Sequence, residues 1–385
     1  MAMKDNEILE GNGTIEKTCG EATNVQAERL RNLLKDILDI YSPTGKEEEV
    51  LEYAEEYLKS QGLPVTKQEV DDNRFNLIVF PEETDEVDLC FVGHLDTVTA
   101  YDIEDFGFYQ EEDTVFGLGA ADMKAGCAAM MEAFTVLVNR GGAFPPVGLA
   151  LVVGEEEDSD GAKALVQEYS LPWAVIGEPT NLVPCLGHYG YLEVLLRTRG
   201  KRAHSSMPEL GQNAIEAMLK LLLQVMEHAI SLFQGSVYNI RQLMGFPGGF
   251  VVPDACDAWL DIHLAPDSRI DVLKAELEQL VETAGKSIPD LDAYIRFENT
   301  YSGYRISHER PLVKTLQTVY KNMSLPWGPQ DFRSHSDGNV LWTAGVDPII
   351  LGPGRLEAAH TPEESVSFDQ VVKAAQLYLN FALSL

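Results

Sequence analysis

A histidine and an aspartate stand one residue apart in the segment Phe91–Thr97, FVGHLDT, where an apolar run ends. His94 can bind a metal ion through one ring nitrogen, and a carboxylate such as that of Asp96 can fix the tautomer through the other nitrogen. The pair could equally cap a turn. Three further polar signatures, GLGAAD, GEEE and GEP, follow at strand-like boundaries and favour the metal interpretation.

Carboxylates recur where other predicted elements begin or end. The apolar run Val147–Val153 predicts a buried strand followed by four adjacent acids, Glu155 to Asp158, and Glu178 follows another predicted strand. Adjacent carboxylates are costly to hold together unless cations neutralise them. Asp122 stands at the start of a predicted amphipathic helix, where helix capping is the alternative interpretation.

These side chains would meet at the carboxyl edge of an open α/β sheet, where binding sites commonly form. Two imidazoles and three carboxylates suit two zinc-like ions, and cobalt or manganese would accept the same set: His94, Asp122, Glu156, Glu178 and His360. Asp122 is the best candidate to bridge the ions together with a hydroxide. Glu155 could take a proton from a metal-acidified water and pass it to a leaving amine. The predicted chemistry is amide hydrolysis.

The elements that position these residues alternate between helix and strand, which predicts an α/β fold with a mixed sheet. From about Gly190 the order becomes strand, helix, strand, strand, helix, strand, which is typical of a ferredoxin-like βαββαβ unit. We therefore expect a catalytic domain in two parts, residues 1–189 and 302–385, interrupted by an inserted domain over 190–301. Residues 1–25 are polar and predict a loose tail.

Composition restricts the partners. The 385 residues include 29 Lys and Arg against 61 Asp and Glu, for a formal net charge of -32. Such a surface repels phosphate backbones and anionic membranes, which argues against nucleic acid or a membrane as the main partner. No apolar run approaches the roughly 18 residues of a membrane span. Five scattered cysteines without a CxxC pattern indicate a reducing compartment, and we expect a cytoplasmic protein.

Two other site types have little support. The Gly117–Asp122 segment lacks the third glycine of a dinucleotide-binding loop, and no strand leads into it in the required way. Ser336 does not lie in a GxSxG elbow, so a serine hydrolase is not indicated.

Six motifs resemble those of the dizinc hydrolase family that contains acetylornithine deacetylase, succinyl-diaminopimelate desuccinylase, aminoacylase and carboxypeptidase G. They are GHLDTV, GLGAADMKAG, GEEEDSDGA, IGEPT, AHSSMPELGQNAI and LGPGRLEAAHTPEE. The resemblance runs from roughly residue 30 to 380 and keeps the family's order and spacing. It implies a zinc-exopeptidase-like catalytic domain in which His94 and Glu178 hold one metal, Glu156 and His360 the other, and Asp122 bridges them.

The resemblance also implies catalytic roles. Asp96 would orient His94, and Glu155 would be the general base; a slip of one residue along GEEE is the alternative. The inserted domain would serve as a lid and form a homodimer. His204, in AHSSMP, would then reach the partner subunit's active site and polarise the scissile carbonyl.

Two positions depart from the family's pattern. Relatives commonly carry Asn at Phe250 and Arg at His263, which puts the usual preference for an α-carboxylate in doubt. Arg333 or Arg355 could compensate as a carboxylate fork, or could be exposed surface residues.

The predicted function is cleavage of the amide bond of a small N-acyl amino acid, as in acetylornithine deacetylase. A dipeptidase, tripeptidase or carboxypeptidase with the same dinuclear mechanism is the alternative. A non-catalytic metal-binding relative is a third hypothesis, although every expected ligand and the base are present.

Overall fold

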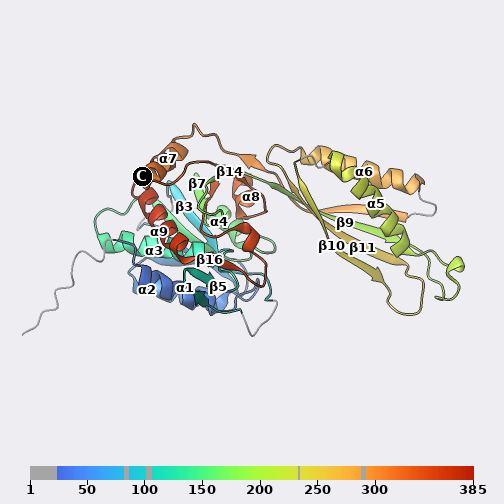
Figure 1. Ribbon diagram of the computed structural model, residues 1–385, viewed down its shortest axis with the longest axis horizontal. Coiled ribbons are helices and arrows are strands. Elements are labelled where there is room, and N and C mark those ends of the chain that lie inside the picture. Colours follow the sequence, from blue (N-terminus) through green and yellow to red (C-terminus); the bar gives the residue numbers. More distant parts are fainter. Residues whose placement is uncertain (1–23, 82–85, 101–105, 233–234, 288–291) are drawn as a thin grey trace, which may run out of the picture.

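The computed structural model describes residues 24–81, 86–100, 106–232, 235–287 and 292–385. The predicted tail, residues 1–25, falls almost wholly outside this range. Two bodies lie side by side along the long axis of the molecule (Figure 1). We call residues 190–301 the inserted unit, and the remaining described residues the main unit. Among the described residues, no helix has the length and apolar character that crossing a membrane requires.

A mixed sheet forms the centre of the main unit. β3 pairs in parallel with β6 and β7, and β7 in parallel with β15, whereas β1 and β2 are antiparallel additions at one edge. The sheet order is β1 (Val65–Glu69), β2 (Phe75–Val79), β6 (Val147–Val152), β3 (Leu89–His94), β7 (Trp173–Ile176), β15 (Asp347–Ile350), β8 (Cys185–His188) and β13 (Tyr304–Arg305), with β14 (Gln330–Phe332) beside β8. The mixed α/β fold predicted from the sequence is confirmed.

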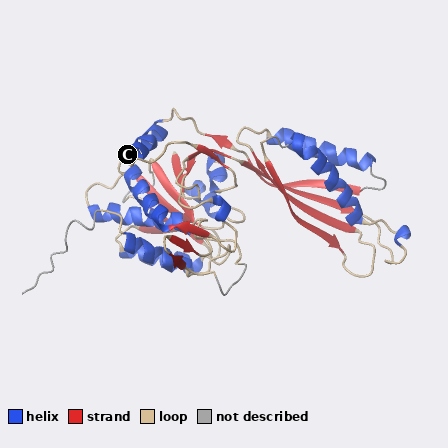
Figure 2. Cartoon of the chain, in the orientation of Figure 1, coloured by secondary structure: helices blue, strands red, loops and turns tan. Residues whose placement is uncertain are grey.

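Helices cover this sheet on both sides (Figure 2). They are α1 (Ala27–Leu38), α2 (Glu48–Ser60), α3 (Lys124–Arg140), α4 (Asp160–Glu168), α7 (Pro311–Asn322), α8 (Asp337–Thr343) and α9 (Phe368–Ala382). A short sheet of β4 (Tyr109–Glu111), β5 (Thr114–Phe116) and β16 (Ser365–Ser367) brings the C-terminal region beside the segment that leads into α3.

The amphipathic character predicted for the helix after Asp122 is wrong. Every residue of α3 from Lys124 to Leu137 is buried. The reason is that α1 and α9 pack against α3 and the sheet closes its remaining side, so it has no solvent face over those turns.

The inserted unit has its own sheet and its own apolar core. Its order is β9 (Gly190–Arg199), α5 (Ala214–Leu232), β10 (Val237–Phe246), β11 (Ala255–Leu264), α6 (Ile270–Ser287) and β12 (Asp292–Tyr301). The four strands are antiparallel in the order β10-β11-β9-β12. Residues such as Leu192, Val194 and Ile262 pack with α5 and α6. Because side chains alternate across a strand, the residues between them point to the opposite face.

Candidate metal centre

Acidic and histidine side chains converge at one edge of the main sheet. His94 is the last residue of β3, Glu155 and Glu156 lie in the turn after β6, and Glu178 lies two residues after β7. Since these three strands are parallel neighbours, their carboxyl ends share this edge. Asp122 joins them from the loop that leads into α3.

His94 is buried and contacts three of these carboxylates. Its Nε2 lies 3.3 Å from Asp122 Oδ1, 3.6 Å from Glu178 Oε1 and 3.8 Å from Glu155 Oε2. On the other side of the ring, Nδ1 lies 3.0 Å from the backbone carbonyl oxygen of Asp96. That contact keeps a proton on Nδ1, so Nε2 is the ring nitrogen that would bind a metal ion in the acidic cluster.

The carboxylate of Asp96 positions the acidic turn as well as His94. It accepts hydrogen bonds from the backbone amides of Glu155 and Glu156 at 3.3 and 3.1 Å, and from the Thr44 hydroxyl at 2.8 Å. Its distance from His94 Nδ1 is longer, 3.5 Å. Asp96 therefore couples the end of β3 to the turn after β6.

His360 reaches the same cluster from the C-terminal part of the chain. Its Nε2 lies 3.0 Å from Glu156 Oε2 and 3.6 Å from Asp122 Oδ2. Asp122 thus directs one oxygen toward His94 and the other toward His360. This is the arrangement that a carboxylate bridging two ions requires.

Burial and mutual proximity shift the pKa values of the acids and histidines in the cluster. Desolvation raises the pKa of Glu178 and of Glu155 well above the usual range, and the neighbouring carboxylate of Asp122 raises both further. Although burial opposes it, the hydrogen bonds to Asp122 and Asp96 raise the pKa of His94. A hydrogen bond to Glu156 raises the pKa of His360 to about 9. A divalent cation would lower these pKa values, because it stabilises the ionised acids and the neutral imidazoles.

The residues present fit divalent ions. Within two groups, one potential ligand atom from each residue lies within 4.8 Å of the others: His94, Asp122 and Glu156, and His94, Glu155 and Glu178. Glu178 Oε1 is buried and has no hydrogen-bond partner among the described residues. Such an oxygen is costly to bury unless an ion takes the place of water.

The sequence did not single out Glu364, which holds the Asp122 loop in place. Its buried carboxylate accepts hydrogen bonds from the backbone amides of Gly119, Ala121 and Asp122 at 3.0, 2.9 and 3.0 Å. Asp122 is therefore not the N-cap considered from the sequence; Met123 occupies that position before α3. The HTPEE motif carried the only sequence signal for Glu364.

Other singled-out residues lie away from the cluster. His204 is exposed, and its Nδ1 lies 2.8 Å from the Ser206 hydroxyl. Phe250, Arg333 and Arg355 are exposed as well. Ser336 is the buried N-cap of α8 and accepts a hydrogen bond from the amide of Gly338, which explains it without a nucleophilic role.

A cavity of about 570 Å³ opens over the cluster. The main unit forms the floor of the cavity, and the inserted unit forms one wall. The floor includes Asp122, Glu155, Glu156, Glu178 and His360. That wall includes Tyr191, Glu193, Arg241, Asp261, His263, Asn299 and Tyr301, and His335 of the main unit lies beside it. Of these residues, the sequence analysis had singled out only His263.

Residues 90–384 match the protein-family profile described as Peptidase family M20/M25/M40. The chain belongs to this family. Acetylornithine deacetylase from Vibrio parahaemolyticus is 26% identical over 336 residues, which cover 83% of this chain and 87% of that protein. A peptidase M20 domain-containing protein from Schizosaccharomyces pombe is 27% identical over 361 residues, covering 91% and 83%. As a member of the M20 family, the protein is a metal-dependent amidohydrolase.

Solved structures share the fold. A tripeptidase from Staphylococcus aureus has a TM-score of 0.79 at 23% identity and covers 94% of this chain and 99% of its own. Human carnosine dipeptidase 1 has a TM-score of 0.76 at 13% identity, with 93% and 96% covered. Because each match covers more than nine tenths of this chain, it includes residues of both the main and the inserted unit.

Proposed function

We propose that this M20 protein hydrolyses the amide bond of a small N-acylated amino acid with two divalent cations, zinc in the first instance. The observation that carries the proposal is the position of Asp122, with one oxygen toward His94 and the other toward His360. His94 and Glu178 would hold one ion and Glu156 and His360 the other, with Asp122 shared. When bound, such a pair of ions acidifies water and polarises an amide carbonyl.

The residues around the ions divide the remaining work. Glu155 is buried at the cavity floor and is proposed as the general base that takes a proton and returns it to the leaving amine. Asp96 would fix the Nδ1–H tautomer of His94 and the turn that carries Glu155. A slip along GEEE would make Glu157 a site residue, but Glu157 is exposed whereas Glu155 is buried, which supports the first assignment.

We propose further that the inserted unit is a domain that serves as lid and as dimer contact. β10 is an edge strand with exposed apolar residues, among them Leu243 and Phe246. On α5, Leu219, Leu223 and Met226 are exposed at helical spacing. A second copy of the chain would cover both, and His204 would then act in the partner's cavity.

Cytoplasmic location remains a prediction from the cysteine pattern.

The direct test measures metal content and substrate class together. Protein purified without chelator should hold about two divalent ions per chain and release free amine from N-acetyl amino acids. Depletion by a chelator should abolish hydrolysis, and zinc, cobalt or manganese should restore it to different extents. Faster release from dipeptides would replace the deacylase assignment by the peptidase alternative. Absence of hydrolysis with any metal would favour the non-catalytic relative.

A further inference from the structure

The inserted unit lines the cavity with polar and aromatic side chains from one face of its sheet. Tyr191 and Glu193 alternate along β9, and their partners in register on β11 are His263 and Asp261. Tyr301 of β12 lies opposite Tyr191 on the other side. The helices α5 and α6 cover the reverse face, where the apolar residues of these strands point. These side chains therefore face the cavity as one patch.

The charge of the whole cavity lining is more negative than two metal ions would balance. Two divalent ions would balance the four carboxylates at the floor, Asp122, Glu155, Glu156 and Glu178. The cavity lining still holds four more acids against a single guanidinium, that of Arg241: Glu157, Asp158, Glu193 and Asp261. An anionic group on the substrate would meet repulsion here, and a cationic group would meet attraction.

Arg241 does not offer a fork to a substrate carboxylate, because it is already engaged. One terminal nitrogen pairs with Glu193, and the other lies 3.4 Å from Asp261 Oδ1. The second oxygen of Glu193 accepts from the Asn299 amide at 3.2 Å. Asp261 Oδ1 also accepts from the Tyr191 hydroxyl at 3.0 Å, whereas Oδ2 takes part in no hydrogen bond or ion pair among the described residues. Asp261 Oδ2 can therefore accept a hydrogen bond from a substrate group.

Aromatic rings and unpaired imidazole nitrogens complete the wall. The ring of Tyr191 lies 5.3 Å from those of His263 and His335, and Tyr301 lies 4.7 Å from His335. His263 Nδ1 and His335 Nε2 are buried without a hydrogen-bond partner among the described residues. A neutral imidazole has one donor and one acceptor nitrogen, so the unpartnered nitrogen of each ring can accept a hydrogen bond from a group in the cavity.

We propose that Asp261, with the faces of Tyr191 and Tyr301 and the imidazoles of His263 and His335, binds an ammonium group of the substrate. A carboxylate, two π faces and neutral nitrogen acceptors are the groups that recognise an ammonium ion. His335 Nδ1 lies 3.9 Å from Glu155 Oε1, so the subsite adjoins the proposed base. The ammonium is either a side-chain amine of an N-acyl amino acid or the free amino terminus of a short peptide. This inference rests on the proposed function, whose substrate class it narrows.

Two matched pairs of substrates test the proposal on the metal-replete enzyme. N-acetyl-lysine and N-acetyl-norleucine differ in the side-chain ammonium; alanyl-alanine and propionyl-alanine differ in the terminal ammonium. In one pair, the charged member should have a kcat/KM at least about tenfold higher. The pair that discriminates identifies the source of the ammonium. Equal or faster hydrolysis of both neutral members would overturn the proposal.

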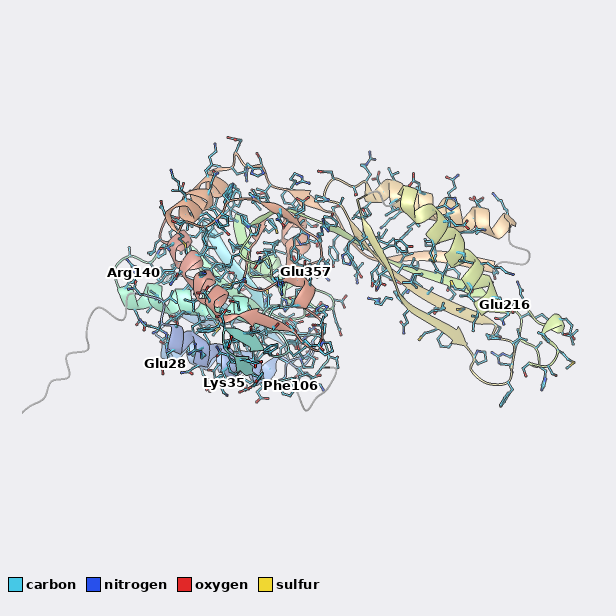
Figure 3. All side chains as sticks on the ribbon, viewed as in Figure 1. Glu28, Lys35, Phe106, Arg140, Glu216 and Glu357 are labelled. Carbon is cyan, nitrogen blue, oxygen red and sulfur yellow. The ribbon has the colours of Figure 1, made fainter. Side chains whose placement is uncertain are left out.

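Variants separate the subsite from the metal centre. Asp261→Asn should lower the ratio of kcat/KM between the charged and neutral members about tenfold and keep the metal content. Glu216→Gln, on the inserted unit at the start of α5 and exposed, is the control and should keep the ratio (Figure 3). An unchanged ratio in Asp261→Asn would reject the subsite.

Binding provides a readout that does not depend on turnover. In calorimetry with Glu155→Gln enzyme, the charged member of the discriminating pair should bind about tenfold more tightly than the neutral one. Equal affinity in both pairs would contradict the subsite. Preferential binding by wild-type enzyme that hydrolyses none of the four compounds would support the subsite and count against the proposed function alone.

Discussion

His360 Nε2 lies 3.0 Å from a carboxylate oxygen of Glu156, a residue 204 positions earlier in the chain. The contact joins the two parts of the main unit across the inserted unit. His360 has a φ of 57°, in the left-handed region, which non-glycine residues seldom adopt. The backbone of the C-terminal segment therefore holds an uncommon conformation at the residue that completes the cluster.

Replacement of His360 should remove one metal and spare the other. His360→Ala takes away the imidazole near Glu156 but leaves His94, Asp122 and Glu178 in contact. Metal analysis after dialysis should find about one ion per chain instead of two, with hydrolysis reduced at least a hundredfold. The matched control is Glu357→Gln, exposed nearby on the short 3-10 turn Leu356–Ala358 (Figure 3). Retention of two ions by His360→Ala would remove this residue from the ligand set.

The general base should be separable from metal binding. Glu155→Gln keeps the shape of the side chain and removes its ability to take a proton. We expect both ions to remain and kcat to fall about 10²- to 10⁴-fold, the range typical of lost general base catalysis. A metal-replete Glu155→Gln enzyme with normal turnover would show that another group moves the proton.

The sequence allowed us to predict site residues that stand at the end of a strand and belong to a recognisable motif. It did not allow us to predict residues whose role depends on contacts with distant parts of the chain. His94 and Glu178 follow apolar strands, so their shared sheet edge could be anticipated. Glu364 bonds to amides 242 to 245 residues away, a relationship that periodicity does not contain. Side chains alternate across β9, but this local pattern does not contain the information that the face of Glu193 lines the cavity. Burial of α3 on all sides likewise depends on α9, far away in sequence.

Glu364 should act on metal affinity through the loop it holds. Glu364→Gln has one carbonyl oxygen in place of two carboxylate oxygens, so part of the set of three amide hydrogen bonds is lost. The Asp122 loop would then be less constrained, and we expect metal affinity to fall about 10- to 100-fold. Competition with a metal-sensitive dye measures the change. Glu363→Gln, exposed beside it, should have no effect, and equal affinity in both variants would refute the role.

The proposed dimer can be tested by complementation. His204→Ala should keep the metal content, because His204 lies outside its own chain's cavity lining. It should lower turnover, because the side chain would act in the partner's cavity. A mixture of His204→Ala and Glu155→Gln chains, unfolded and reassembled together, should regain activity, since each heterodimer holds one intact site. Leu223→Glu on the exposed face of α5 should give monomers in sedimentation and prevent the recovery. Full activity of His204→Ala alone would exclude the residue from catalysis.

Acid should destabilise the protein partly through His188. This buried ring bonds to the Tyr189 carbonyl and the Ser336 hydroxyl, and desolvation lowers its pKa to about 4 from the ordinary 6.5. Below pH 6.5 the unfolded chain takes up a proton that the folded chain refuses, so stability falls as pH decreases toward 4. At pH 5 the loss is about 2 kcal/mol. Urea midpoints of wild type and His188→Gln in the same metal buffer should therefore converge between pH 8 and pH 5; parallel profiles would contradict the assignment.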